Sequence, residues 1–543
     1  MACHFHLGGR LMLHEHTGTP IFNRRTFLAT ASAALAGAAL GGGLTPNSEA
    51  AKRHAQRGGT LEFGTRNDPG GLDSHRQNQN HASNATALMY TGLTDIDWHG
   101  NIVPGIAESW EPNKELTAWV FKLRKGVLFH NGREVDAEAV KLNLDRIKDP
   151  SIGSDWHRGA IDTIARVEVV DKYTVRIHSH VPDVTIPSSV MHYPTNLQAP
   201  DNFDKAAEHP IGTGPFKFVS WTRFNETRLK RFENYWETDA EGNHLPYLDE
   251  LIAKPKKEDS VRLTALRTGQ VQLIDSMAYA DVERFKQAAG DKYTIWPTHA
   301  GGFFVAFNFR RGPFQDKRLR TAAAHAIDRQ AIHHAVFYGQ GEMLDQPFPR
   351  GNPWHIESRS LEYDPDKAKT LLKQARAVGT EVKIVCNTTV TAHREAMQVI
   401  QEQWNSVGFK AAVQPLDTVP FTQARKQGDF DGLINGHTYR FDPDDFFGRN
   451  LHSKSEYTHV LSGWENARVD QLLEEAKRIT DAAKRKALYT EVWSIVNVEL
   501  PQFHLHEMTV IAAALKTVQG YKPASMGAYG YKDGGMRTTY MKA

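Results

Sequence analysis

One stretch constrains the fold of this chain more than any other, and it runs from Ile211 to Trp236. It opens with the letters GTGP (212–215), in which the glycines can adopt positive φ and Pro215 fixes its own φ. Two sets of side chains then alternate along the chain on either side of a polar link at 222–226. In the first segment, 216, 218 and 220 are Phe, Phe and Ser, and 217, 219 and 221 are Lys, Val and Trp; in the second, 227, 229 and 231 are Thr, Leu and Arg, and 228, 230 and 232 are Arg, Lys and Phe. This period of two predicts a β-hairpin after a tight bend.

The two glycines also permit a second interpretation, a dinucleotide- or phosphate-binding loop. That motif requires a third glycine and a helix directly after the turn. Here Pro215 and a predicted strand follow instead. The sequence therefore favours a scaffold hairpin over a phosphate site.

Length and charge limit the class of protein. A chain of 543 residues is too long for one ordinary core, so we expect two or three lobes. The net charge of +2 gives no indication of nucleic acid or a membrane surface as partner. Lys122 and Arg124 share one face of a predicted strand, but no aromatic residues interleave with them there, so we expect no nucleic-acid site.

Cysteine use is minimal, with Cys3 and Cys386 only. Cys3 lies in a segment that we expect to be removed, which leaves no disulfide and no cysteine-based zinc site. Cys386 follows the predicted strand 382–385, so we expect a buried, unreactive thiol rather than a nucleophile.

Residues 1–50 have the pattern of a twin-arginine export signal. The letters NRRTFL (23–28) precede an apolar run rich in Ala and Gly, Phe27–Leu44, and a small-x-small cleavage site, SEA (48–50). A transmembrane helix and a surface helix are the alternatives, and the paired arginines favour export. No cysteine follows the run, so we expect no lipid anchor. The exported protein is expected in the periplasm.

Three further segments of the chain have the form of signature blocks, as the segment 211–236 does. They are FKLRKGVLFHNG (121–132), RLTALRTG (262–269) and NFRRGPFQDKRLRTAAAHAIDR (308–329). Together with GTGPF and NYW at the two ends of 212–236, they resemble the signature blocks of the family 5 extracellular solute-binding proteins. This is the peptide/nickel/opine group of ABC importers. One departure is Gln272, at a position where the family has Asp.

The resemblance implies an α/β, bilobed type II periplasmic-binding-protein fold with an extra domain, so that three domains form two lobes. We expect domain I at 51–80, 205–305 and 510–543, domain II at 81–204 as an extension of the first lobe, and domain III at 306–509 as the second lobe.

Local patterns in the C-terminal half fit an α/β lobe. A capped helix at 364–372, a strand at 382–385, a helix at 397–407 with Gly408 as its C-cap and a strand at 409–413 are predicted. Two amphipathic helices at 469–479 and 482–498 follow. Two strands at 500–504 and 510–514 are predicted to return to the first lobe.

Ligand contacts are implied by the resemblance at the loop 435–444, before Pro443. Peptide binders of the family place an Asp four residues before this proline, where it neutralises a peptide ammonium. This chain has Tyr439 there, followed by Arg440, with Asp442 next to the proline. A ring and a guanidinium suit an anionic or aromatic solute such as an opine. Alternatively, Arg440 pairs with Asp442 or Asp444 at the surface.

Other candidate ligand-binding residues stand in loops or strands expected near the cleft. They are Asp68, Trp156, Arg158, Phe303 and His437. Trp156 and Arg158 are expected in a polar loop, with a partly buried surface tryptophan as the alternative. His333 and His334 are adjacent, so they cannot form an i, i+4 metal pair, and we expect neither a metal site nor a cofactor.

The function that the resemblance implies is capture of a solute between two lobes and delivery to the transmembrane permease subunits of an ABC importer. We expect a monomer without catalytic residues, because the chain contains no HExxH, GxSxG, CxxC or P-loop motif. A secreted hydrolase on the same fold, and a ligand sensor or peptide chaperone, are the alternatives.

Overall fold

The computed structural model describes residues 57–542 except 77–84, 98–99, 192–194, 389, 439–441, 524–529 and 533. Residues Ala55–Ala543 form one compact unit. The export signal predicted at 1–50, and Cys3 within it, lie outside the described residues.

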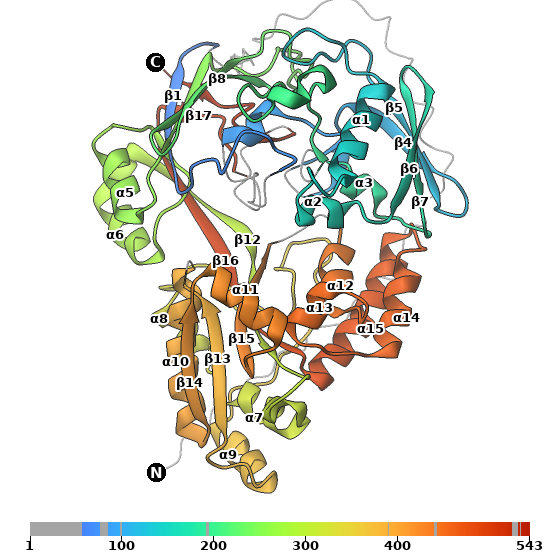
Figure 1. Ribbon diagram of the computed structural model, residues 1–543. Coiled ribbons are helices and arrows are strands. Elements are labelled where there is room, and N and C mark those ends of the chain that lie inside the picture. Colours follow the sequence, from blue (N-terminus) through green and yellow to red (C-terminus); the bar gives the residue numbers. More distant parts are fainter. Residues whose placement is uncertain are drawn as a thin grey trace, which may run out of the picture. The chain divides into compact units, whose positions relative to one another are not determined.

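A ten-stranded mixed sheet runs through this unit (Figure 1). Its strands, in spatial order, are β14 (Lys410–Leu416), β13 (Glu381–Asn387), β15 (Gly432–Thr438), β12 (Tyr293–Phe307), β16 (Gln502–Leu515), β11 (Leu273–Ile274), β1 (Thr60–Thr65), β10 (Glu250–Pro255), β9 (Glu226–Arg231) and β8 (Phe216–Thr222).

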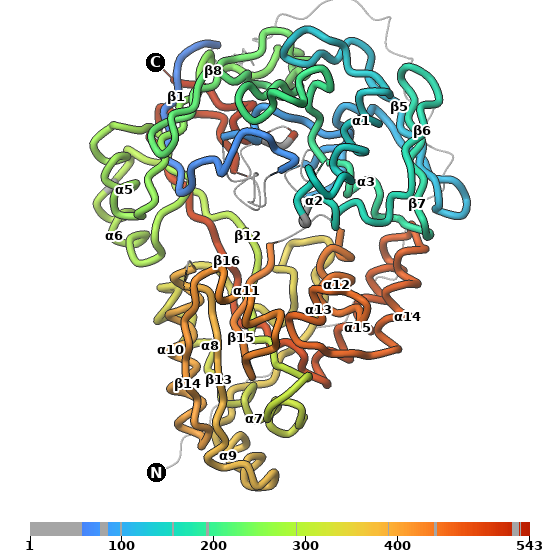
Figure 2. The backbone as a smooth tube through the Cα atoms, in the orientation of Figure 1, coloured from blue at the N-terminus to red at the C-terminus, as the bar shows by residue number. Residues whose placement is uncertain are grey.

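Two long antiparallel strands, β12 and β16, join the two ends of this sheet. One end of the pair lies beside β11 and the other beside β15. The chain crosses from one part to the other along β12 and returns along β16, which Figure 2 allows the reader to follow. We call β12 and β16 the hinge strands. The first lobe is the part that contains β1 and β8–β11, and the second lobe is the part that contains β13–β15.

The first lobe also holds a four-stranded antiparallel sheet, in the order β4 (Ala107–Pro112), β5 (Ala118–Leu123), β7 (Thr174–Ser179) and β6 (Ile164–Asp171). Its short strands are β2 (Thr94–Ile96), β3 (Ile102–Pro104), β17 (Val518–Gln519), β18 (Gly530–Tyr531), β19 (Gly534–Gly535) and β20 (Tyr540–Met541). Its helices are η2 (Ala85–Met89), α1 (Ala137–Lys148), α2 (Asp155–Ala160), α3 (Ile186–Ser189), η3 (Pro200–Lys205), α5 (Asp259–Arg267), α6 (Tyr279–Ala289) and η4 (Gly290–Lys292).

The second lobe covers its strands with helices. These are η5 (Pro313–Gln315), α7 (Lys317–His325), α8 (Arg329–Ala335), α9 (Pro365–Gln374), α10 (Thr391–Val407), α11 (Thr418–Gln427), α12 (Asp444–Leu451), α13 (Glu456–Leu461), α14 (Ala467–Ala476) and α15 (Ala482–Glu499). Each lobe has apolar clusters of its own, around Phe121 and Val140 in the first and around Trp404 and Trp493 in the second. The domain boundaries given above remain our proposal.

The predicted hairpin is confirmed, with β8 and β9 paired and Thr222 opposite Glu226. The reason for its glycines is different from the one expected, because neither Gly212 nor Gly214 has positive φ. A Cβ on Gly212 would lie 2.0 Å from the carbonyl oxygen of Met89, and one on Gly214 would lie 2.5 Å from that of Leu88. The glycines therefore let the backbone pass close to η2, whose end accepts a hydrogen bond of 2.9 Å from the Gly214 amide at Met89.

Helix caps were predicted well. At the helix predicted from 364, the Asp364 side chain accepts a backbone amide, and Gly408 ends α10 with φ of 116°. Asp136 and Asp316 cap α1 and α7 in the same way. Cys386 is fully buried, as expected, and burial raises the pKa of its thiol to about 11.

Three local predictions were wrong. The strands expected at 500–504 and 510–514 are one strand, β16. Helix α10 begins at Thr391 rather than Met397. The loop expected at 154–158 contains the short helix α2, because the Ser154 side chain accepts the His157 amide at 3.3 Å and caps its first turn.

Candidate functional site

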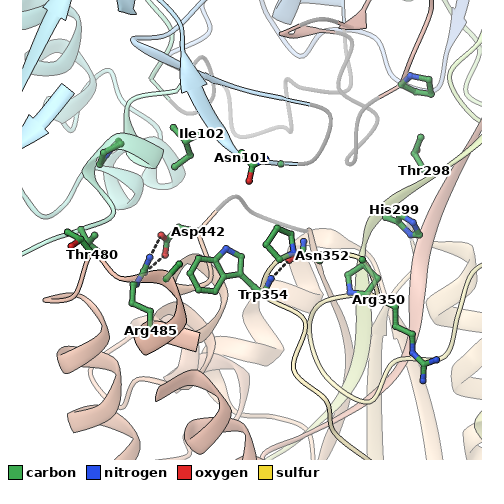
Figure 3. A pocket seen from close by; sticks show the side chains of 18 of the residues that line it. Asn101, Ile102, Thr298, His299, Arg350, Asn352, Trp354, Asp442, Thr480 and Arg485 are labelled. Carbon is green, nitrogen blue, oxygen red and sulfur yellow. Dashed lines mark hydrogen bonds and ion pairs between the residues drawn. The ribbon is translucent and has the colours of Figure 1, made fainter. Parts of the chain in front are cut away.

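A cavity of about 770 Å³ is lined from both lobes and from the hinge (Figure 3). The first lobe contributes Gly100, Asn101, Ile102, Trp110, Val184, Pro187 and Pro523; the hinge strand β12 contributes Pro297, Thr298 and His299; the second lobe contributes Pro349–Trp354, Asp442, Thr480, Ala482 and Arg485. The volume lies within the range of about 300–1,000 Å³ that small-molecule sites occupy.

Asp442 and Arg485 form a buried ion pair at the second-lobe side of the cavity. Two hydrogen bonds of 2.8 and 2.7 Å join the Arg485 guanidinium to both carboxylate oxygens. Arg485 also donates to the Tyr489 hydroxyl at 3.0 Å and lies 5.3 Å from the centre of the Trp354 ring. The charge of Asp442, the single carboxylate among the described lining residues, is therefore already compensated.

His299 is the titratable group that the hinge presents to the cavity. Its side chain is 56% exposed, and Nδ1 contacts the carboxylate of Glu507 on β16, whose side chain is 1% exposed. The hydrogen bond to Glu507 raises the pKa of His299, because the buried carboxylate stabilises the imidazolium. Figure 3 shows His299 at the hinge edge of the site, with the Arg350 guanidinium directed away from it.

The two lobes touch beside the cavity. The Val184 amide of the first lobe donates to the carbonyl oxygen of Lys477 in the second lobe at 3.0 Å. Lys477 Nζ in turn lies 3.1 Å from Asp444 Oδ2. Burial raises the pKa of the nearby Asp162 and of Asp444, which Lys477 partly offsets. Residues of the two lobes are therefore in direct contact at one edge of the site, where Val184 also lines the cavity.

Of the ligand-binding residues predicted from the sequence, Asp442 lines the cavity. Tyr439, Arg440 and the side chain of Trp156 lie outside the described residues. The positions of Tyr439 and Arg440 fall between Thr438, the last residue of β15, and Asp442.

The other four candidates have structural contacts and are not among the cavity-lining residues. Asp68 accepts the Trp221 indole at 3.0 Å and the Phe224 amide at 2.9 Å, which fixes the β8–β9 turn. Arg158 donates to the Gly153 carbonyl next to α2. Phe303 is fully buried in the second-lobe core, and His437 Nε2 lies 2.9 Å from the Pro347 carbonyl oxygen.

Sequence reasoning missed His299, Trp354 and Arg485. Trp354 ends a run of turn residues, PRGNPW (349–354), and a large aromatic residue in such a run is the one signal that could have found it. None of the helices in the described part of the chain combines the length and hydropathy that a membrane crossing requires. Within those same residues, no group of three or more His, Cys, Asp and Glu side chains is arranged to hold a metal ion.

The chain is similar to known bacterial binding proteins in both sequence and structure. The sequence is 27% identical over 504 residues to Di/tripeptide-binding protein 1 of Pseudomonas aeruginosa, an alignment that covers 86% of this chain and 92% of that protein. The structure is similar to the periplasmic binding protein DppA of Helicobacter pylori in complex with the peptide STSA, with a TM-score of 0.76, 23% identity and coverage of 90% and 99%.

A second similar structure is AgaA of an Agrobacterium (A.tumefacien R10) in complex with agropinic acid, with a TM-score of 0.74, 24% identity and coverage of 89% and 99%. Both likenesses show the α/β type II periplasmic-binding-protein fold that was predicted. Residues 101–458 match the family described as bacterial extracellular solute-binding proteins, family 5. This chain therefore belongs to the family 5 bacterial extracellular solute-binding proteins.

Proposed function

We propose that this chain is the exported binding component of an ABC importer, which captures an anionic, peptide-like or aromatic solute and delivers it to the permease. The observation that carries the proposal is the cavity, lined from two lobes that two hinge strands connect. A solute that contacts both walls favours the closed arrangement over open ones, so binding shifts a population and needs no covalent chemistry.

The charges around the cavity favour an anion. Arg350 and His299 line it, and the charges of Arg485 and of Asp442, the one carboxylate among the described lining residues, compensate each other. A peptide ammonium would lack a free carboxylate partner there, and an unpaired charge in a desolvated site is costly. Tyr439 and Arg440, which stand three and two positions before Asp442 in the sequence, remain our proposed ring and anion contacts, and Trp354 adds an aromatic surface.

Similar proteins are named for solutes that carry a carboxylate. These solutes are di- and tripeptides, the peptide STSA and agropinic acid. We further propose twin-arginine export of a monomer to the periplasm without a lipid anchor, on the strength of the NRRTFL letters and the apolar run after them.

A hydrolase is the second candidate, since one contact favours it. The His299–Glu507 pair resembles the base and its orienting carboxylate in a catalytic triad. The hydroxyl next to it in sequence, Thr298 Oγ1, donates to the Val510 carbonyl oxygen at 3.0 Å and is committed to the hinge. No Ser or Cys is among the described residues that line the cavity, so we propose a binder rather than an enzyme.

A thermal-shift screen with a carboxylate panel tests the proposal. The panel consists of glutathione, agropinic acid, Gly-Glu, Ala-Phe and citrate, with Gly-Gln and the amide of Ala-Phe as matched compounds that lack one carboxylate. At 100–1,000 times Kd, a bound carboxylate should stabilise the protein by about 3–4 kcal/mol, and more than its matched compound does. Stabilisation by none of the five would contradict an anionic solute.

The same samples distinguish a solute-binding protein from a hydrolase. After a day with the protein, each stabilising compound should be recovered intact by chromatography. Breakdown of the compound that stabilises the protein would favour the hydrolase instead.

A further inference from the structure

A β-bulge in the hinge strands sets the direction of His299. His299 lies opposite Thr509 and Gly301 lies opposite Met508, so Ala300 is an extra residue in β12. Bulges redirect neighbouring side chains and often adjoin functional sites. His299 is thereby directed into the cavity, which it lines (Figure 3).

Gly301 and Gly302, the two residues after Ala300, explain the position of the bulge in β12. A Cβ on Gly301 would lie 1.8 Å from the carbonyl oxygen of His437, and one on Gly302 would lie 2.7 Å from His437 Cε1. Strand β12 therefore presses against β15 directly after His299, and only glycines permit that approach. The bulge is a built feature of the hinge.

Glu507 supplies the reason for a histidine at this position. Its carboxylate is buried, Oε1 contacts His299 Nδ1, and Oε2 has no hydrogen-bond partner among the described residues. A buried carboxylate needs a cation beside it, because an unpaired charge in the interior is strongly unfavourable. The imidazolium form of His299 is that cation.

The remaining charged groups near His299 act in the same direction or face elsewhere. The Glu342 carboxylate also favours the imidazolium, and its Oε1 accepts the Arg350 amide at 2.9 Å. Arg350 carries the nearby positive charge, and Figure 3 shows its guanidinium directed away from His299. With Nδ1 donating to Glu507, the other ring nitrogen, Nε2, carries a proton that a solute can accept.

We propose that His299, held as an imidazolium by Glu507, binds a carboxylate of the captured solute. This inference rests on the proposed function and deepens it by naming the group that meets the anion. Because His299 belongs to a hinge strand, it is present at the site before either wall moves. A charge-assisted hydrogen bond to the solute follows, and its strength depends on the proton of His299.

The pH dependence has a definite sign. The hydrogen bond to Glu507 raises the pKa of His299 above 6.5, which enlarges the cationic fraction of the ring at neutral pH. Affinity for a carboxylate is therefore greatest below that pKa and falls as pH rises through it. Bound carboxylate, a second negative group beside the ring, should raise the pKa of His299 further by linkage.

Isothermal titration of the five-carboxylate panel against His299→Gln tests the inference, with His178→Gln as the matched control. His178 Nε2 likewise lies 2.7 Å from a glutamate, Glu168, but is not among the residues that line the cavity. We expect His299→Gln to weaken carboxylate binding about tenfold or more and to remove its pH dependence between pH 6 and 9. His178→Gln should bind as the wild type does.

A second measurement covers the case in which His299→Gln does not fold. Nuclear magnetic resonance of the wild-type histidine Cε1–H signals should show the pKa of His299 rising when a panel carboxylate is bound. Equal affinity of wild type and His299→Gln, or a His299 signal that binding leaves unchanged, would overturn the inference and leave the proposed function intact. Failure of the wild type to bind any panel carboxylate would instead contradict the proposed function.

Discussion

At the scale of single residues, Arg485 shows how the second-lobe wall is held. The residue is 4% exposed, and its guanidinium donates to both oxygens of Asp442 and lies against the Trp354 ring. Removing one partner of a buried pair leaves the other charge without compensation, which costs more than the pair contributes.

We therefore expect Arg485→Met to lower the free energy of unfolding by about 3–5 kcal/mol. Arg468→Met is the control. Arg468 of α14 pairs at 2.8 Å with Glu491, which lies on α15 as Arg485 does, and the Arg468 side chain is 54% exposed. That exposed pair should contribute about 0–1 kcal/mol. Urea unfolding of both variants measures the difference, and equal losses would contradict the role given to burial.

The sequence indicated one half of this pair. Asp442 was found because it stands next to Pro443 in the loop that the family resemblance marked. Its partner lies 43 residues away on an amphipathic helix, where an arginine has the same pattern whether it faces solvent or a carboxylate. His299 was missed for a related reason, since nothing local indicates that Glu507 lies beside it.

At the scale of elements, the hinge strands are the feature that local patterns describe least well. Strand β12 spans Tyr293–Phe307 and β16 spans Gln502–Leu515, whereas apolar alternation was visible only in parts of each. His504, His506 and Glu507 are buried polar residues in the first half of β16, and they interrupt the apolar pattern on which the prediction depends. Helix starts were easier, because an Asp cap is a local signal.

Gly301→Ala tests the close approach that forms the bulge. The clash is with backbone of β15, which cannot rotate away, so we expect a loss of about 1–3 kcal/mol or more. Gly159→Ala in α2 is the control, since no atom lies within 4 Å of an added Cβ there and its φ is ordinary. Thermal unfolding compares them, and a Gly301→Ala protein as stable as the wild type would show that the strands can separate.

At the scale of the whole molecule, buried neutral histidines set the response to acid. His393, His504 and His506 are at most 6% exposed, and burial lowers the pKa of each, to about 4 for His393 and His506. The unfolded chain binds these protons near pH 6.5, before the folded chain does, so stability is complete above that pH and falls as pH drops toward 4. The raised pKa of His299 contributes stability that is constant below pH 6.5 and is lost only as pH rises above it, so it does not change the response to acid.

We expect the urea midpoint to fall steeply between pH 7 and 5, with each of the three histidines costing on the order of 1 kcal/mol or more. His393→Gln should reduce the dependence on pH by one histidine's share. A midpoint that does not change over this range would contradict the assignment of neutral, buried rings.

Fold and family could be predicted for the whole molecule because they depend on sequence blocks such as the 211–236 hairpin. The solute depends on a cavity assembled from residues 100 to 523, and no stretch of sequence contains that arrangement. We propose that this cavity holds an anionic solute by its carboxylate, at the hinge.

A crystal structure of the complex with the panel carboxylate that binds most tightly would show where the solute and its carboxylate lie. We predict the solute between Trp354 and His299, with a carboxylate oxygen about 3 Å from His299 Nε2. A solute bound outside the cavity, or one whose carboxylate lies away from the hinge, would contradict it.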